Sequence, residues 1–173
     1  MRVLVTGCVG FIGYHVCEYL LKKNCHVLGI DNINNYYDTK LKKDRLRLLN
    51  KKKNFNFFKI DISNHKILKN FFIKKKFDYV IHLAAQAGVR FSIYNPNVYF
   101  KSNLQGFFNI INLSHEKKIK HFIFASSSSV YGDQGKFPLK ENYRTDFPKS
   151  FYAATKKSNE IIAHSYSAIY KMK

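Results

Sequence analysis

The stretch RVLVTGCVGFIG, residues 2–13, decides the fold of this 173-residue chain. Its first part, Arg2–Thr6, is a short apolar run of the kind that forms a buried strand. Glycines stand at positions 7, 10 and 13, and the segment Phe11–Lys23 has the spacing of a helix, whose apolar face we expect to carry Ile12, Val16, Tyr19 and Leu20. A strand, a glycine-rich turn and a helix in this order are typical of a nucleotide-binding unit.

The glycine-rich turn predicts an anion site. Gly7 permits a tight turn, Gly10 lets the backbone approach a pyrophosphate, and Gly13 lets helix and strand pack closely. The N–H groups that open the helix, including those of Phe11 and Ile12, and the positive end of the helix dipole favour a phosphate there. A tight turn without a ligand is the alternative interpretation of the same glycines.

The rest of the chain alternates short apolar runs with helical patterns. Further strands are predicted at His26–Ile30, Asn56–Ile60, Tyr79–Leu83 and His121–Ala125. Helices are predicted at Asp38–Asn50, Asn64–Ile73, Asn97–Glu116 and Phe151–Lys171, and a loop at Gly132–Pro148. This order predicts one α/β domain, residues 1–173, with a doubly wound parallel sheet of the Rossmann type that helices cover on both faces.

The charge of the chain is strongly positive. It has 30 Lys and Arg against 11 Asp and Glu, a formal net charge of +19. The lysines are scattered along the sequence, and the runs Lys51–Lys53 and Lys74–Lys76 each precede an apolar strand-like segment, where a solvated connection is expected. We therefore expect the charge to help attract an anionic ligand such as a nucleotide sugar, and we expect no nucleic-acid partner.

Apolar runs and cysteines indicate the compartment. No apolar run reaches the roughly 18 residues of a membrane span, so we expect no membrane span. Cys8, Cys17 and Cys25 are odd in number and lack metal-ligand spacing. They indicate reduced thiols in a cytoplasmic protein without a metal site.

Acidic residues follow two of the predicted strands. A carboxylate at Asp31 can accept both ribose hydroxyls of an adenosine and would repel a 2′-phosphate, which favours NAD over NADP; a turn or capping role is the alternative. Asp61 is placed to reach the adenine, and capping the next helix is an equal alternative. Their neighbours Asn32 and Ile62 belong to the same predicted cofactor site.

Small and hydroxyl-bearing residues end the next two strands. Leu83, Ala84 and Ala85 leave room for a nicotinamide ribose close to the backbone. The run Ser126–Ser129 offers hydroxyls that can bond a substrate hydroxyl or carbonyl, because ligands of open α/β sheets bind beyond the carboxyl ends of the strands.

A tyrosine and a lysine follow on the last predicted helix. Tyr152 and Lys156 are four residues apart, so they lie on one face of that helix. An ammonium beside a phenol favours the phenolate, which lets a tyrosine act as a base or acid near neutral pH. The pair alone is a weak signal, and the glycine turn, Asp31 and the serines give it a cofactor and a substrate oxygen.

Together these features resemble the extended short-chain dehydrogenase/reductase family, in its nucleotide-sugar epimerase branch. The similarity covers the whole chain and is greatest to the UDP-glucuronate 4-epimerases, through Asp31–Asp38, His82–Arg90, Ser126–Gly132 and Tyr152–Lys157. Dehydratases of the family tend to carry an acidic pair after the hydroxyl of the fifth strand, where this chain has Ser128 and Ser129. The resemblance therefore favours epimerisation over dehydration.

The resemblance implies a mechanism with NAD as a bound cofactor and a UDP-sugar as substrate. Tyr152 takes the proton of the sugar 4-hydroxyl, the C4 hydride passes to NAD, and a 4-keto sugar turns over before the hydride returns. Lys156 assists Tyr152 and bonds the nicotinamide ribose, Ser127 positions the 4-oxygen, and Ser128 assists. The resemblance implies that the reaction interconverts UDP-glucuronate and UDP-galacturonate without net redox change, and another sugar-nucleotide epimerase or dehydratase of the family is the alternative.

The resemblance also raises two expectations about assembly. Family members are roughly twice as long, so we expect the C-terminal strands and substrate domain to be missing. The isolated chain should then bind NAD weakly without turnover, either as part of an epimerase or as a catalytically silent NAD-binding remnant. The helices Asn97–Glu116 and Phe151–Lys171 resemble those that form a homodimer interface in this family, with simple coverage of the sheet as the alternative.

Overall fold

A five-stranded parallel sheet forms the centre of the protein. The computed structural model describes residues 1–134 and 137–173. The strand order is β3-β2-β1-β4-β5, and all four neighbouring pairs are parallel. The strands are β1 (Arg2–Thr6), β2 (His26–Asp31), β3 (Phe55–Lys59), β4 (Tyr79–His82) and β5 (His121–Phe124). Each lies within one residue of its predicted position, because short buried apolar runs bounded by turns are a local signal.

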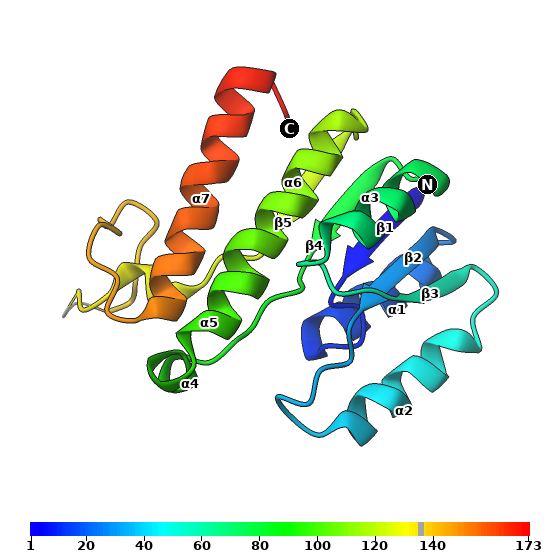
Figure 1. Ribbon diagram of the computed structural model, residues 1–173, viewed down its shortest axis with the longest axis horizontal. Helices are drawn as coiled ribbons and strands as arrows, with labels where there is room; N and C mark the ends of the chain where they lie inside the picture. The colour runs from blue at the N-terminus through cyan, green and yellow to red at the C-terminus, as the bar shows by residue number, and fades with distance from the viewer. Residues whose placement is uncertain (135–136) are drawn as a thin grey trace.

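Helices cover both faces of the sheet, so the predicted doubly wound α/β fold is confirmed (Figure 1). On one face, α3 (His65–Lys74), α6 (Gly106–Glu116) and α7 (Phe151–Tyr170) pack around Leu4, Val80 and Phe107. On the other, α1 (Phe11–Lys22) and α2 (Thr39–Asn50) pack around Val3, Val27 and Phe55. Two apolar cores on opposite sides explain why the strands are apolar throughout rather than alternating.

The buried face of α1 matches the predicted one only in part: Leu20 is buried and Val16 packs against the core, as expected. Gly13, Cys17 and Leu20 are buried, whereas Ile12 and Tyr19 are 59% and 62% exposed. The prediction placed the most apolar residues toward the sheet. The rotation of the helix is set instead by the close approach of Gly13 to Gly7 and Cys8 in the glycine turn. Packing at one glycine therefore overrides the hydrophobicity of two larger side chains.

The predicted helix Asn97–Glu116 is longer and less regular than expected. It begins with α5 (Pro96–Tyr99), passes through a π-helical segment, η1 (Phe100–Gln105), and continues as α6. A short helix, α4 (Val89–Tyr94), and a 3₁₀ turn, η2 (Ser128–Tyr131), were not predicted. A π-helical segment inside a helix often accompanies a functional site, and η1 packs against α7 beside the predicted catalytic residues.

The described residues of the predicted loop Gly132–Pro148 form neither helix nor strand. Of the predicted loop Gly132–Pro148, residues 135 and 136 lie outside the described part of the chain. None of the helices in residues 1–134 and 137–173 combines the length and apolarity that crossing a bilayer requires. All three cysteines are free and buried.

Candidate active site

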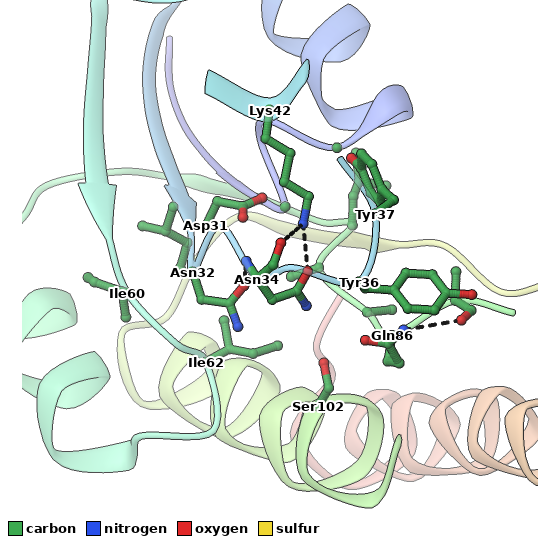
Figure 2. Close-up of a pocket in the computed structure, with 17 residues that line it drawn as sticks. Asp31, Asn32, Asn34, Tyr36, Tyr37, Lys42, Ile60, Ile62, Gln86 and Ser102 are labelled. Carbon is green, nitrogen blue, oxygen red and sulfur yellow. Dashed lines mark hydrogen bonds between the residues drawn. The ribbon is translucent and has the colours of Figure 1, made fainter. Parts of the chain in front are cut away.

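A cleft opens at the carboxyl edge of the sheet, where β1, β2 and β4 end (Figure 2). The glycine turn contributes Gly7 and Gly10, and the residues after β4 contribute Leu83, Ala84 and Ala85. Asp31, Asn32 and Ile62 line the same cleft. Eight of the predicted cofactor-binding residues thus meet in one place, as expected for the carboxyl ends of parallel strands.

The glycine turn has the geometry that a phosphate-binding loop needs. Gly7 has a φ of +69°, and a Cβ there would lie 2.7 Å from the backbone nitrogen of Ala84. A Cβ on Gly13 would overlap the carbonyl of Gly7. Helix α1 starts at Phe11 and Ile12, and among the described residues no side chain caps its N-terminus. Its first N–H groups are therefore free to bind an anion at the edge of the cleft.

The acidic residues form a connected group at the ends of β2 and β3. Asp31 accepts a hydrogen bond from the N–H of Ile33 at 2.7 Å, and burial raises the pKa of its carboxyl. The side chain of Asn32 donates to Asp61 at 3.0 Å. Asp61 also accepts from the N–H and hydroxyl of Ser63. Although burial acts to raise the pKa of Asp61, hydrogen bonds from Asn32 and Ser63 outweigh it and lower this pKa.

The capping alternative for Asp61 is wrong. The N-cap of α3 is Asn64, whose side chain accepts from the N–H of Ile67. Asp61 itself is not a lining residue of the cleft, although Asn32, its hydrogen-bond partner, is one. A contact of Asp61 with adenine stays a prediction.

Two basic side chains from α2 were missed in the sequence. Figure 2 shows Lys42 reaching into the cleft beside Asp31, where its ammonium bonds the carbonyl and side-chain oxygens of Asn34 at 2.9 and 2.6 Å. Burial lowers the pKa of Lys42 and the Asp31 charge opposes this. Arg45 donates to the carbonyl of Val9 in the glycine turn at 3.3 Å. The signal for both was their placement on one helix directly after the Asp31 segment.

Thr6 and His82 connect the glycine turn to the end of β4. The hydroxyl of Thr6 accepts from the N–H groups of Leu83 and Ala84 at 3.1 and 3.0 Å and lies 2.8 Å from Nδ1 of His82. Burial, with a smaller effect of the Lys156 ammonium, lowers the pKa of His82 to about 3. The ring is therefore neutral. Because the Thr6 oxygen already accepts from two N–H groups, its hydroxyl proton is the one that bonds Nδ1. These bonds hold the backbone that lines the cleft.

Lys156 lies at the end of β5. Its ammonium donates to the carbonyl of Ala125 at 2.9 Å, and burial lowers its pKa to about 8. Ala125 in turn donates its N–H to the carbonyl of His82, which ties this point to the end of β4. Tyr152 lies one turn earlier on α7, half-buried, with its ring against Tyr99 at 6.0 Å between centroids.

The serines after β5 differ in their surroundings. Ser127 is the N-cap of η2, and its hydroxyl oxygen accepts from the N–H of Ser129 at 3.2 Å. A hydroxyl that accepts from the backbone can still donate its own proton to a substrate oxygen. Ser128 is exposed, and Ser126 donates to Glu160 on α7 at 2.5 Å. Ser127, Ser128, Tyr152 and Lys156 lie beyond the lining of the cleft described above.

Asn103 joins the two parts of the site. It sits in η1, fully buried, accepts from the N–H of Gln86 at 2.7 Å and donates to the Gln86 carbonyl at 3.0 Å. Its side chain also donates to the hydroxyl of Thr155, which donates to the carbonyl of Tyr152. The loop after β4 and the Tyr152 turn of α7 are thereby held at a fixed distance. Nothing in the spacing of the sequence indicated this bridge.

We expect a pH-dependent contribution of Lys156 to stability. Because burial lowers its pKa in the folded chain to about 8, the unfolded chain alone retains the proton between about pH 8 and about pH 10.4, and the free energy of unfolding rises with pH over this window. Below pH 8 both states are protonated, and this contribution is constant. Urea unfolding gives the free energy of unfolding of the wild type and of Lys156→Met. We expect the wild-type value to rise relative to that of the variant as pH rises through this window. A difference between the two free energies that does not change with pH would contradict the buried ammonium.

Comparisons with known proteins agree with this geometry. The family model described as GDP-mannose 4,6 dehydratase matches residues 4–173. UDP-glucuronate 4-epimerase of Thermodesulfobacterium geofontis is 47% identical over 167 residues, which are 96% of this chain and 51% of that protein. Protein CapI of Staphylococcus aureus is 46% identical over 99% of this chain and 51% of its own length. The chain thus spans about half the length of the curated relatives it matches.

Solved structures give the same result. The UDP-glucuronic acid 4-epimerase of Bacillus cereus in complex with NAD superposes with a TM-score of 0.89 and 33% identity, covering 99% of this chain and 53% of that one. The UDP-glucose 4-epimerase of Thermotoga maritima gives a TM-score of 0.88 at 31% identity, covering 100% of this chain and 53% of that one. The chain therefore belongs to the GDP-mannose 4,6-dehydratase family, in the nucleotide-sugar epimerase branch of the extended short-chain dehydrogenase/reductases.

Proposed function

We propose that this chain is the cofactor-binding and proton-transfer part of an NAD-dependent nucleotide-sugar 4-epimerase that interconverts UDP-glucuronate and UDP-galacturonate. The observation that carries the proposal is the position of Lys156, buried at the end of β5 one turn from Tyr152 and tied through Ala125 to the end of β4. The glycine turn and Asp31 lie along the same carboxyl edge.

The residues of the cleft fit NAD. The uncapped start of α1 and the lack of a side chain at Gly10 suit a pyrophosphate, and Asp31, which lines the same cleft, would accept the hydroxyls of the adenosine ribose. Lys42 neutralises part of the Asp31 charge and adds donors for the ribose or its neighbourhood. Leu83, Ala84 and Ala85 line the cleft directly after His82, whose carbonyl accepts from Ala125, the hydrogen-bond partner of Lys156. When bound, NAD supplies the hydride acceptor and donor that the sugar C4 carbon needs.

The protein moves the proton that accompanies this hydride. Tyr152 removes the proton of the sugar 4-hydroxyl and later returns it, while the Ser127 hydroxyl donates to the same oxygen. The Lys156 ammonium stabilises negative charge on Tyr152. Asn103 acts as a positioning residue, because its bonds fix the Tyr152 turn against the loop after β4. In this division of roles, the cofactor supplies the chemistry at C4 and the protein orients the reacting groups.

The uronate substrate is proposed from the relatives and from one local feature. Relatives at 46–47% identity include UDP-glucuronate 4-epimerases. Ser128 and Ser129 stand where an acidic pair would support dehydration, so the ketone is expected to be reduced again rather than to lose water. The charge of +19 assists the capture of a UDP-sugar.

A chimera tests the proposal. Residues 1–173 would replace the matching half of the Thermodesulfobacterium epimerase, and conversion of UDP-glucuronate would be followed by chromatography. We expect turnover by the chimera and NAD binding by the chain alone, measured by calorimetry. An inactive, folded chimera whose chain half still binds NAD would support the silent NAD-binding remnant, and absence of NAD binding would refute both.

Replacing Asp31 by asparagine should reduce the preference of the protein for NAD over NADP. Asparagine keeps an oxygen for the N–H of Ile33 but removes the charge that repels a 2′-phosphate. We expect NAD affinity to fall about tenfold and NADP affinity to rise, in calorimetric titrations of both. Asp44→Asn is the matched control, since this carboxylate of α2 pairs with Arg47 and lies outside the lining of the cleft. Equal effects of the two changes would argue against Asp31 as the ribose ligand.

We also propose that the protein is a cytoplasmic homodimer. Exposed apolar side chains lie along α5, η1 and α6, where Val98, Phe100 and Phe108 are 42–54% exposed. On α7, Ile161 and Ile169 are 60% and 67% exposed. These elements lie side by side in Figure 1. Light scattering should show a dimer that Phe108→Asp converts to a monomer, while a monomeric wild type at high concentration would contradict the proposal.

A further inference from the structure

Lysines from distant parts of the sequence meet at one end of the molecule. In a parallel sheet, every connection that leads from a helix into a strand lies at the amino ends of the strands. Backbone hydrogen bonds join these connections side by side: His26 to Met1, Val27 to Asn54, Asp78 to Arg2 and Lys120 to Asp78. In Figure 1 the N-terminus, the end of α6 and the turn between α2 and β3 all lie toward the right. The lysines of these connections are therefore distant in sequence but close together in the structure.

We call this surface the amino-end face. Its basic residues are the pair Lys22–Lys23, the runs Lys51–Lys53 and Lys74–Lys76, and Lys117, Lys118 and Lys120. All are exposed except Lys75 and Lys117, which are half-buried with their ammonium groups over the rings of Phe58 and Phe77. Asp78 offsets part of the charge through an ion pair with Lys120 at 3.7 Å. The face keeps a large excess of positive charge.

Helix stability accounts for only part of this charge. A basic residue near a helix C-terminus interacts favourably with the helix dipole, but the effect falls off within the last turn. Lys51–Lys53 extend beyond α2 and Lys76 beyond α3. Two shallow hollows lie among these groups. One is lined by Lys22, Lys51–Lys53 and the single carboxylate of Glu18, and the other by Arg2, Lys76, Lys117 and the carboxylate of Asp78. The arrangement is suited to bind several anionic groups at once.

Exposed aliphatic side chains lie among the lysines. Met1 is 58% exposed beside Arg2, Leu48 is 45% exposed in the last turn of α2, and Ile73 is 72% exposed beside Lys74. Lysines with interspersed apolar side chains are the composition of surfaces that lie on anionic membranes, where the apolar groups enter the headgroup region. Nucleic-acid phosphates attract the lysines but offer no comparable environment to Ile73 or Leu48.

We propose that the amino-end face binds the surface of a bilayer that contains anionic phospholipids. The cleft lies at the opposite, carboxyl end of the strands. A protein docked through the amino-end face therefore keeps its cleft open to the aqueous phase. This peripheral contact needs no membrane-spanning helix.

Vesicle sedimentation tests the proposal. We expect the protein to bind vesicles of about 30 mol% phosphatidylserine in phosphatidylcholine at about 0.05 M salt, and at least tenfold more weakly at about 0.5 M salt. Phosphatidylcholine alone should bind at least tenfold more weakly at the lower salt concentration. Failure of the wild type to sediment with the anionic vesicles would overturn the proposal.

Two variants of equal net charge locate the binding surface. Changing Lys51, Lys52, Lys53, Lys74 and Lys76 to glutamine should lower vesicle affinity at least tenfold. Changing Lys40, Lys43, Lys66, Lys69 and Lys140, which are exposed elsewhere, should leave it within about threefold. Circular dichroism checks that both variants are folded. Equal losses would show that overall charge alone attracts the protein and would overturn the assignment to this face.

Ile73→Ser separates a membrane from a nucleic acid as the partner. We expect vesicle affinity to fall about threefold and binding to a single-stranded RNA of about 30 nucleotides to stay unchanged. The proposal would be overturned if the protein bound this RNA more tightly than vesicles at the same phosphate concentration and Ile73→Ser changed neither affinity. That result would assign the face to nucleic acid.

Discussion

Changing Tyr152 to phenylalanine is expected to lower 4-epimerisation by the chimera at least a hundredfold, because the phenolic oxygen is the group proposed to carry the proton of the sugar 4-hydroxyl. The ring itself should stay in place, since it packs against Tyr99 and its turn is held through Thr155 and Asn103. Calorimetry should therefore find NAD affinity within about threefold of the wild type. The two measurements separate a loss of chemistry from a loss of binding.

Tyr131→Phe is the matched control for this prediction. Tyr131 ends η2 close in sequence to the serines after β5, and it has no role in the proposed proton transfer. Its replacement should change turnover by less than about threefold. If Tyr152→Phe retained turnover as well as Tyr131→Phe does, another group would have to carry the proton.

Gly13→Ala is expected to lower both stability and NAD binding strongly. Alanine favours a helix by about 1 kcal/mol over glycine, but the added Cβ would overlap the Gly7 carbonyl and lie about 3.0 Å from Cys8 Cα. We expect the free energy of unfolding to fall by about 2 to 3 kcal/mol, because the backbone of the glycine turn must move. The same movement should weaken NAD binding at least tenfold. Urea unfolding and calorimetry measure the two effects.

Gly10→Ala provides the comparison. A Cβ at Gly10 would lie 3.1 Å from the Gly7 carbonyl, so the turn needs only a small adjustment. This change should cost less than about 1 kcal/mol of stability and act mainly on NAD binding, through the approach of the pyrophosphate. Stabilisation of the protein by Gly13→Ala would contradict the close packing of α1 on the glycine turn.

Local patterns predicted the strands, the glycine turn and the residues at the strand ends. Arg2–Thr6, for example, forms β1 at its predicted bounds, since a buried parallel strand is a continuous apolar run. The face of α1 was predicted correctly for Leu20 but wrongly for Ile12 and Tyr19, because the rotation of the helix depends on one close contact of Gly13 and not on hydrophobicity.

Contacts between distant residues were beyond what the sequence pattern can predict. Thr6 and His82 are 76 positions apart, and Asn103 and Thr155 are 52 apart. Their polar side chains resemble any others until the sheet and η1 bring them together. The same holds for the lysines of the amino-end face, which only the parallel topology gathers.

The fate of the C4 hydrogen tests the proposed function most directly. The chimera would be incubated with UDP-glucuronate that carries deuterium at C4, and the UDP-galacturonate formed would be analysed by mass spectrometry. If the hydride leaves C4 for bound NAD and returns within the site, the product retains the deuterium. Exchange of the deuterium for solvent hydrogen would show that C4 loses a proton instead, and it would contradict the proposed roles of NAD, Tyr152 and Lys156.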